Sequence, residues 1–234
     1  MFECSLEDPL RCLFPFLAAL SDSVSLFITA DGIRFQSTDG HEALADVFIP
    51  PAKMAFWKYK KDASLEVSAG LWGRALGHIN NQCPIEISQG DHFIEVSKGD
   101  HSFTLPTRTP RETQLIIPEF NHVAVMRMPT RMFLERLRFL QEFGESVNVS
   151  VGEGTASLSA TQDQSEGYVE LLQDNEVSVK SRADYEGLFP LTPLLIIEHF
   201  SPQVISLSVS KEKPLDASFS IGGLLVRVLV SPIS

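Results

Sequence analysis

The second half of the chain repeats the pattern of the first half. The alternating segments at residues 23–28 and 35–38 return 123 positions later at residues 146–151 and 158–161. Each copy follows an apolar run with helical spacing, which ends at residue 20 in one half and reaches residue 137 in the other. A repeat of this length, about half of the chain, indicates a duplicated domain rather than a solenoid of short units.

Composition excludes several classes of protein. The 234 residues are 44% hydrophobic, which is enough for a packed core, yet no apolar run reaches the length of a transmembrane helix. Near the N-terminus Glu3, Glu7 and Asp8 stand where a secretory signal carries lysine or arginine, so we expect an intracellular protein. The three cysteines show no CxxC spacing, which argues against a zinc site and against a disulfide framework.

Most of the sequence alternates between apolar and polar residues, with turn signals such as Asp31-Gly32 and Gly222-Gly223 between the alternating segments. Short strands at this spacing predict antiparallel sheets and an α+β fold. Four segments have helical periodicity, two in each half, and Thr130 is expected to be the N-cap of the third. These segments lie at residues 9–20, 71–80, 130–142 and 191–200.

A proline-containing segment separates the two halves. Residues 106–121 include Pro106, Pro110 and Pro118, which favours an extended crossing over a tight turn. We therefore predict a first domain at residues 1–105, a linker at 106–121 and a second domain at 122–234.

The helices carry cations on their polar faces, although the net charge of the chain is −11. Arg74 and His78 share one stripe, and Arg131, Glu135 and Arg138 repeat that spacing on the third helix. Arginine binds phosphate well, so an acidic chain could still present a phosphate-binding surface on its helices. The alternative is that each stripe is a solvated face of an amphipathic helix.

Motifs of catalysis do not occur. The chain contains no GxSxG, HExxH or P-loop sequence, and its six histidines are scattered. The segments at residues 90–92 and 99–101 are both Gly-Asp-His, but nine residues of extended strand would hold them about 30 Å apart. We expect two turns that flank one strand, no metal, no cofactor and no enzymatic activity.

Several ordered blocks resemble the DNA sliding clamp family, which includes proliferating cell nuclear antigen and its archaeal relatives. The blocks are Met1-Phe2-Glu3, the segment at residues 31–39, Phe56-Trp57-Lys58-Tyr59, the segment at 125–129, Lys213-Pro214-Leu215 and the segment at 229–232. They keep the family's order over essentially the whole chain. The short linker and the end at Ser234 are more similar to archaeal than to eukaryotic members.

The resemblance implies two similar clamp domains, each with antiparallel sheets and two helices on one face, that form part of a ring around duplex DNA. It implies DNA contacts from the helices, without base specificity. The family's DNA-contacting positions correspond to basic Arg74 and Arg138 but also to Ser21, Gly77, Thr192 and His199, where the family often has lysine or arginine. Together with the helix stripes, this gives a candidate DNA-binding set of Arg11, Arg74, His78, Arg131, Arg138 and His199.

The resemblance also implies a pocket for short peptides with an aromatic pair, carried by DNA polymerase, clamp loader, flap endonuclease and ligase. The matching positions are His41, Leu44, Leu115, Ile117, Pro118, Pro214, Leu229, Ser231 and Pro232. The alternative is that these residues are linker and core contacts. Clamp subunits join through edge strands, here expected at residues 101–105 and 167–172, with Phe103, Thr104, Tyr168, Val169 and Glu170 at the interface.

Two functions therefore stay open within this resemblance, and one outside it. The first is a clamp that tethers polymerase and other replication and repair proteins, as a homotrimer. The second is a subunit of a heterotrimeric or checkpoint-type clamp that does not trimerise with itself. An enzyme or a β-rich ligand-binding module is the remaining alternative. A clamp would work in the cytoplasm of an archaeon or in the nucleus of a eukaryote.

Overall fold

The computed structural model describes residues 2–6, 10–77, 85–110, 113–152, 154–200 and 202–233. The chain forms two compact units. Unit 1 contains Met1–Asp39, Ala45–Ile116 and Ser220–Val226, and unit 2 contains Gly40–Leu44, Ile117–Phe219 and Arg227–Ser234. No helix in the described part of the chain is long and apolar enough to cross a membrane.

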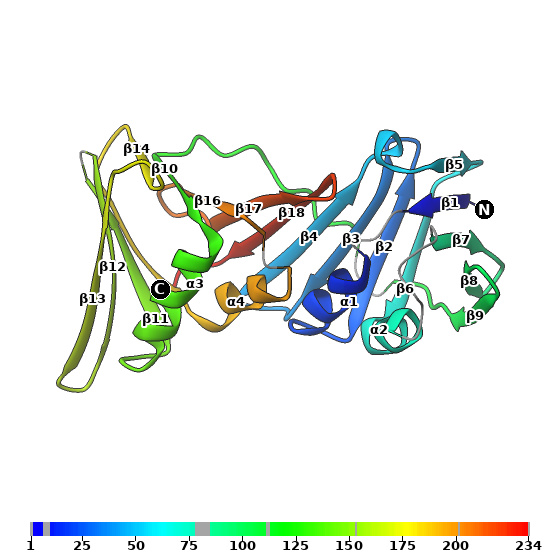
Figure 1. Ribbon diagram of the computed structural model, residues 1–234, viewed down its shortest axis with the longest axis horizontal. Coiled ribbons are helices and arrows are strands. Elements are labelled where there is room, and N and C mark those ends of the chain that lie inside the picture. Colours follow the sequence, from blue (N-terminus) through cyan, green and yellow to red (C-terminus); the bar gives the residue numbers. More distant parts are fainter. Residues whose placement is uncertain are drawn as a thin grey trace. The chain divides into compact units, whose positions relative to one another are not determined.

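Unit 1 holds the first two α-helices and the first nine strands, apart from Ala43 and Leu44 of β4, and these elements are drawn in blue to green in Figure 1. Their bounds are β1 (Phe2–Leu6), α1 (Leu10–Ala18), β2 (Ser23–Thr29), β3 (Gly32–Thr38), β4 (Ala43–Ile49), η1 (Pro51–Lys53), β5 (Phe56–Tyr59), β6 (Ala63–Ser68), α2 (Ala69–Gly77), β7 (Ile85–Gln89), β8 (Phe93–Lys98) and β9 (His101–Pro106).

Unit 2 holds the remaining elements, including the larger part of β17 and of β18. Their bounds are β10 (Ala124–Pro129), α3 (Thr130–Gln141), β11 (Ser146–Val151), β12 (Thr155–Gln162), β13 (Ser165–Leu172), β14 (Ser178–Ser181), β15 (Tyr185–Pro190), α4 (Thr192–Leu195), η2 (Ile196–His199), β16 (Val204–Val209), β17 (Leu215–Ile221) and β18 (Leu224–Val230).

The α-helices and strands follow the same order in both units: one strand, a helix, five strands, a helix and three strands. Strand order repeats as well. In unit 1 the strands are arranged β5-β1-β7-β8-β9 and β4-β3-β2-β6, and in unit 2 the corresponding strands are arranged β14-β10-β16-β17-β18 and β13-β12-β11-β15. The pairings are antiparallel. The predicted fold class, antiparallel sheets with few helices, is confirmed.

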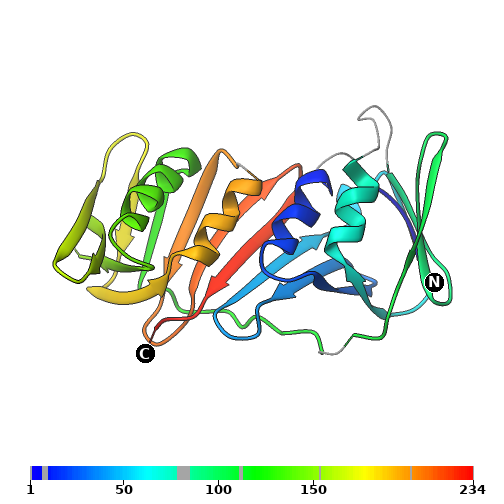
Figure 2. The same ribbon diagram turned by 90° about the horizontal axis from the view of Figure 1, so that it is seen from below.

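The two helices of each unit lie on one face of its sheets (Figure 2). In unit 1, Phe14 of α1 packs against Trp72 of α2 with ring centroids 4.6 Å apart, and against Phe35 of β3 at 5.8 Å. All three rings are at most 1% exposed. Burial of large aromatic side chains is the main stabilising contribution in such a core.

A buried apolar stripe on helix α3 explains why its polar residues face solvent. Phe133, Leu137 and Leu140 recur at helical spacing and are at most 1% exposed, so the other side of the helix must carry Arg131 and Arg138. The predicted N-cap was wrong. Pro129 occupies that position, and Thr130 is the first helical residue with a buried hydroxyl that has no hydrogen-bond partner within the described part of the chain.

The predicted fourth helix is shorter than its periodicity indicates. Only Thr192–Leu195 is α-helical, and Ile196–His199 continues as a 3₁₀ turn. Pro193 stands in the first turn of α4, where its missing N–H leaves no hydrogen bond unmade.

One glycine is required by close packing. Gly32 turns the chain between β2 and β3 with φ +133°, and a Cβ atom there would lie 2.2 Å from the carbonyl oxygen of Ile49. The turn predicted at Asp31-Gly32 is therefore confirmed. The two Gly-Asp-His segments also behave as expected, because β8 runs between them.

Candidate nucleic-acid and partner interfaces

A groove of about 590 Å³ runs between α3 and η2 in unit 2. Three of the predicted DNA-binding residues, Arg131, Arg138 and His199, line it together. Each has an exposed side chain because the apolar stripe of α3 and the buried Ile196 and Ile197 of η2 face the core. The fold thus brings side chains about 60 residues apart in sequence to one surface.

The two arginines of this groove are already paired with carboxylates. Arg131 Nε donates to Glu135 Oε1 at 2.8 Å within the helix, and this hydrogen bond raises the pKa of the arginine. Arg138 Nη2 donates to Glu198 Oε2 at 2.6 Å across the groove. A phosphate would therefore have to compete with Glu135 and Glu198 for these guanidinium groups.

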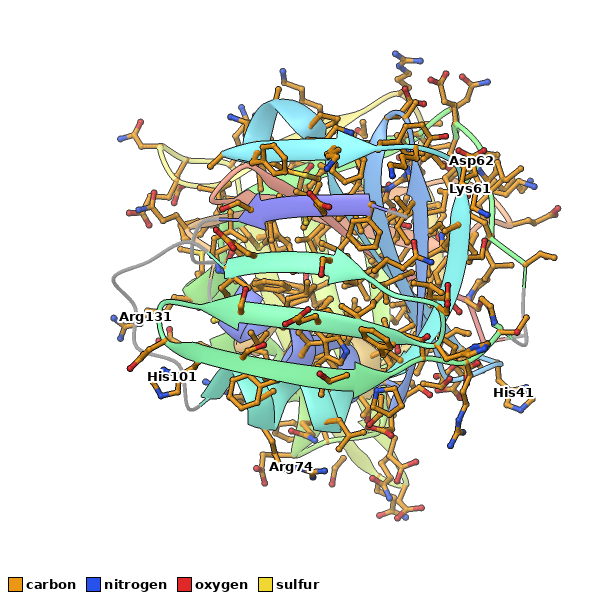
Figure 3. All side chains as sticks on the ribbon, turned by 90° about the vertical axis from the view of Figure 1, so that its right-hand side faces the viewer. His41, Lys61, Asp62, Arg74, His101 and Arg131 are labelled. Carbon is orange, nitrogen blue, oxygen red and sulfur yellow. The ribbon has the colours of Figure 1, made fainter. Side chains whose placement is uncertain are left out.

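In unit 1 the structure describes the side chain of only one predicted cation, Arg74. Arg74 of α2 is exposed and projects from the helical side of the unit (Figure 3). Arg11 lies on α1, but its side chain is outside the described set, and His78 is outside the described residues.

The proline-containing crossing after β9 is held to unit 1 at two points. Arg108 pairs with Glu66 of β6 through two backbone hydrogen bonds of 2.9 Å. Further along, the side-chain amide of Gln36 on β3 forms two hydrogen bonds with the backbone of Leu115. Gln36 Nε2 donates to the carbonyl oxygen of Leu115 at 2.8 Å, and the backbone N–H of Leu115 donates to Gln36 Oε1 at 2.9 Å.

Gln36 belongs to a buried polar network. Its Nε2 also donates to Asp46 Oδ1 at 2.9 Å, while Arg34 Nη1 donates to Asp46 Oδ2 at 2.7 Å. Asp46 is 2% exposed and Gln36 is 5% exposed. A buried carboxylate is tolerated only when it is paired and hydrogen-bonded, and here it receives donors on both oxygens.

The predicted peptide-binding residues fall on several segments. In unit 2 the backbone N–H of Ser231 donates to the carbonyl of Glu42 at 2.7 Å, so the C-terminal segment runs beside the segment of His41 and Leu44. Other members of the set differ in exposure: Pro118 and Pro232 are exposed, Ile117, Pro214 and Ser231 are half-buried, and Leu229 is only 7% exposed. In unit 1, Leu115 is 43% exposed.

Sequence reasoning missed the most exposed large apolar residue of the crossing. Ile116 is 86% exposed, next to Leu115 whose backbone is held by Gln36. The run Leu115-Ile116-Ile117 before a proline carried the signal, because three large apolar residues in a polar crossing have no core to enter.

Both strands predicted to join subunits end a sheet. β9 is the last strand of the order β5-β1-β7-β8-β9, and β13 is the first of β13-β12-β11-β15. Tyr168 and Leu172 of β13 are each 58% exposed. On β9, Phe103 is half-buried and Thr104 is exposed; on β13, Val169 is half-buried and Glu170 is exposed. Edge strands with exposed apolar side chains are surfaces on which another strand can pair.

Replacing Gln36 with leucine tests the anchor of the crossing. The variant loses both hydrogen bonds to Leu115 and one donor to Asp46, so the free energy of unfolding should fall by about 1–3 kcal/mol, and proteases should cleave residues 113–120 faster. Urea unfolding and mass spectrometry of limited digests measure the two effects. Gln114→Leu in the same crossing is the matched control, and an unchanged cleavage rate in Gln36→Leu would refute the anchor.

Comparison with known proteins bears on the family that this chain resembles. The chain is 21% identical over 228 residues to a protein named DNA polymerase sliding clamp from Nitrosopumilus maritimus (strain SCM1), and the match covers 93% of this chain and 91% of that protein. No protein family model matches the chain. The coverage extends through both units, and the resemblance of this chain to the DNA sliding clamps is confirmed.

Proposed function

We propose that this chain is a subunit of a DNA sliding clamp, a non-enzymatic factor that encircles duplex DNA and tethers polymerase and other replication and repair proteins. The observation that carries the proposal is the full duplication of strand and α-helix order in a chain similar to a sliding clamp along 93% of its length. Two domains, at residues 1–105 and 122–234, would be joined by the crossing at 106–121.

The helices are the proposed DNA-facing surface. Arg74 of α2, Arg131 and Arg138 of α3, and His199 of η2 are exposed. Contacts from such side chains go to phosphates and carry no base specificity, as sliding requires.

A heterotrimeric clamp is the second candidate, and the ion pairs of α3 favour it. Glu135 and Glu198 neutralise Arg131 and Arg138, and the chain has a net charge of −11. A ring built from three such subunits would attract DNA weakly, so a more basic partner subunit would supply the missing charge.

Introduction of a charge on an edge strand tests assembly. In the proposed ring β9 of one subunit pairs with β13 of the next, so Tyr168→Asp should dissociate the assembly by burying an unpaired carboxylate in the interface. Light scattering after size-exclusion chromatography should give about three times 25.9 kDa for a homotrimer. Tyr168→Phe should keep the assembly.

A heterotrimer would instead show the mass of one chain alone and the full ring only with its partner subunits. A single-chain mass that persists in the presence of every related subunit would contradict both forms of the proposal.

Two double variants test the DNA surface. One removes arginines and should weaken DNA binding, and the other removes the carboxylates that pair with arginines and should strengthen it. Arg74→Ala with Arg138→Ala should weaken duplex binding. The negative slope of log affinity against log salt concentration should become shallower by about 0.9 for each phosphate that is no longer neutralised. Glu135→Gln with Glu198→Gln should strengthen binding, because it frees both guanidinium groups of α3. Fluorescence anisotropy with a labelled duplex measures both changes.

Lys61→Ala is the control, since Lys61 lies at the opposite end of unit 1 from Arg74 (Figure 3). Equal affinity of all these variants would show that the helices do not face DNA.

The crossing and the C-terminal segment form the proposed peptide site. Exposed apolar side chains at a held segment can receive an aromatic pair, and burial of two rings supplies several kcal/mol at about 25 cal/mol per Å² before ordering costs. The residues proposed to contribute are His41, Leu44, Leu115, Ile117, Pro118, Pro214, Leu229, Ser231 and Pro232.

Alanine at two of these positions tests the peptide site. We expect a polymerase-type peptide with an aromatic pair to bind with a Kd of about 1 μM, and Leu44→Ala and Ile117→Ala each to raise that Kd about tenfold without lowering the melting temperature by more than a few degrees. Calorimetry gives the Kd, and Leu225→Ala, an exposed leucine of β18 outside the set, is the control. No heat with several such peptides would refute the site.

A further inference from the structure

A second groove, of about 680 Å³, lies along β10 and β14 in unit 2 and contains none of the residues assigned above. These two strands lie side by side (Figure 1) and pair with Val125 opposite Lys180 and Arg127 opposite Ser178. Residues 120–123, at and just after the end of the crossing, line one side. There the backbone N–H of Arg182 donates to the carbonyl of Val123 at 2.9 Å.

Three cations project from one face of this strand pair. Lys180 lies on β14 and Arg182 is the residue after the end of that strand, where its N–H bond to Val123 continues the register of the ladder. Arg127 is diagonal to Lys180 across the ladder, so alternation places all three on one face. Their side chains are exposed, and none forms an ion pair within the described residues. By contrast, Arg34, Lys58, Arg131, Arg138 and Arg227 are each bound to a carboxylate.

The internal repeat shows what is different about this groove. In unit 1 the corresponding strands are β1 and β5, where Glu3 stands opposite Lys58 and binds it at 3.1 Å. Glu3 and Lys58 are 55 positions apart, and Val125 and Lys180 have the same separation. The buried residues that follow, Cys4 and Met126, also correspond, so valine stands where unit 1 has the carboxylate and Arg127 stands where unit 1 has Ser5.

The spacing of the cations indicates the shape of the ligand. Alternate residues on a strand are about 6.6 Å apart, so an extended peptide with carboxylates at alternate positions matches Lys180 and Arg182 in register. The groove also contains apolar surface from Phe120, Val125 and Val204, and Val204 is 46% exposed. Glu176 at its edge opposes a uniformly anionic ligand such as a nucleic-acid backbone.

We propose that this basic groove binds an extended acidic segment of a partner protein, in which carboxylates and apolar side chains alternate. The carboxylates bind Arg127, Lys180 and Arg182, and the apolar side chains pack on Phe120 and Val204. This site shares no residue with the groove between α3 and η2 or with the set of residues proposed for the peptide site.

The test uses the full chain and a fluorescein-labelled peptide of four Glu-Leu repeats, with binding followed by anisotropy. A peptide of the same composition with the glutamates in one block controls for spacing, and four Lys-Leu repeats control for charge. We expect the alternating acidic peptide to bind at least about fivefold more tightly than the block peptide, and affinity to fall as salt increases.

Three variants locate the binding. Lys180→Ala with Arg182→Ala should weaken binding of the alternating peptide at least about tenfold, and Lys58→Ala, at the corresponding position of unit 1, should leave it unchanged. Val125→Glu should weaken it to a similar degree although no cation is removed, because it recreates the ion pair of Glu3 and Lys58. Circular dichroism verifies that each variant is folded, and Val125→Glu provides the test if the double variant is not.

Two outcomes would overturn the proposal. One is equal affinity of the wild type, the double variant and Val125→Glu. The other is displacement of the peptide by tripolyphosphate or by duplex DNA at lower concentrations than by unlabelled peptide, which would identify an anion or nucleic-acid site instead. Arg74→Ala with Arg138→Ala should not alter peptide affinity, so failure here is distinguishable from failure of the DNA surface.

Discussion

Burial of one apolar stripe on each helix is the constraint on which the candidate surfaces depend. On α3 the side chains of Phe133, Leu137 and Leu140 are almost fully buried, and each such side chain contributes about 1.5–3 kcal/mol relative to exposure. Rotating the helix enough to bury Arg131 or Arg138 would remove that stabilisation and also desolvate a charge. Packing of the core therefore decides which residues reach solvent, and the arginines follow from it.

Ion pairing then decides which exposed cations are available to bind an anionic ligand. The chain has more acidic than basic residues, and several of its arginines already have a carboxylate within hydrogen-bonding distance. Asp46 and Asp216 are buried, and a buried carboxylate without a partner would be strongly destabilising. Their ion pairs with Arg34 and Arg227 are therefore required by the fold. The pairs on α3 are exposed and contribute little to stability. They can be exchanged for phosphate at small cost, whereas the buried pairs cannot.

The sequence predicts much of the local structure because periodicity and turns are local properties. The repeat at residues 23–28 and 146–151 falls on β2 and β11, and the third helix is found within one residue of its predicted end. Thr130 fails as an N-cap because Pro129 already holds the extended conformation before the helix. The apolar pattern of residues 191–200 does not specify that α4 ends at Leu195 and continues as a 3₁₀ turn.

The contacts that hold the crossing could not be predicted in the same way. Gln36 and Leu115 are 79 residues apart, and nothing in the pattern around Gln36 distinguishes a buried amide from a solvent-facing one. The basic groove could not be predicted either, because it also depends on residues that are far apart in the sequence. Arg127 and Lys180 become neighbours only through the register of β10 with β14, which a single sequence does not reveal.

Duplication explains how two copies of one fold can carry surfaces of different charge. The buried positions of β1 and β10, such as Cys4 and Met126, stay apolar because the core requires it; burial also raises the pKa of the Cys4 thiol to about 12. The outward positions are free to change, since a half-exposed pair such as Glu3 with Lys58 contributes only about 0–1 kcal/mol. Replacing that glutamate with valine in the second copy costs the fold little and leaves a lysine unneutralised. A repeat can thus keep its backbone pairing and still acquire a binding surface that its other copy lacks.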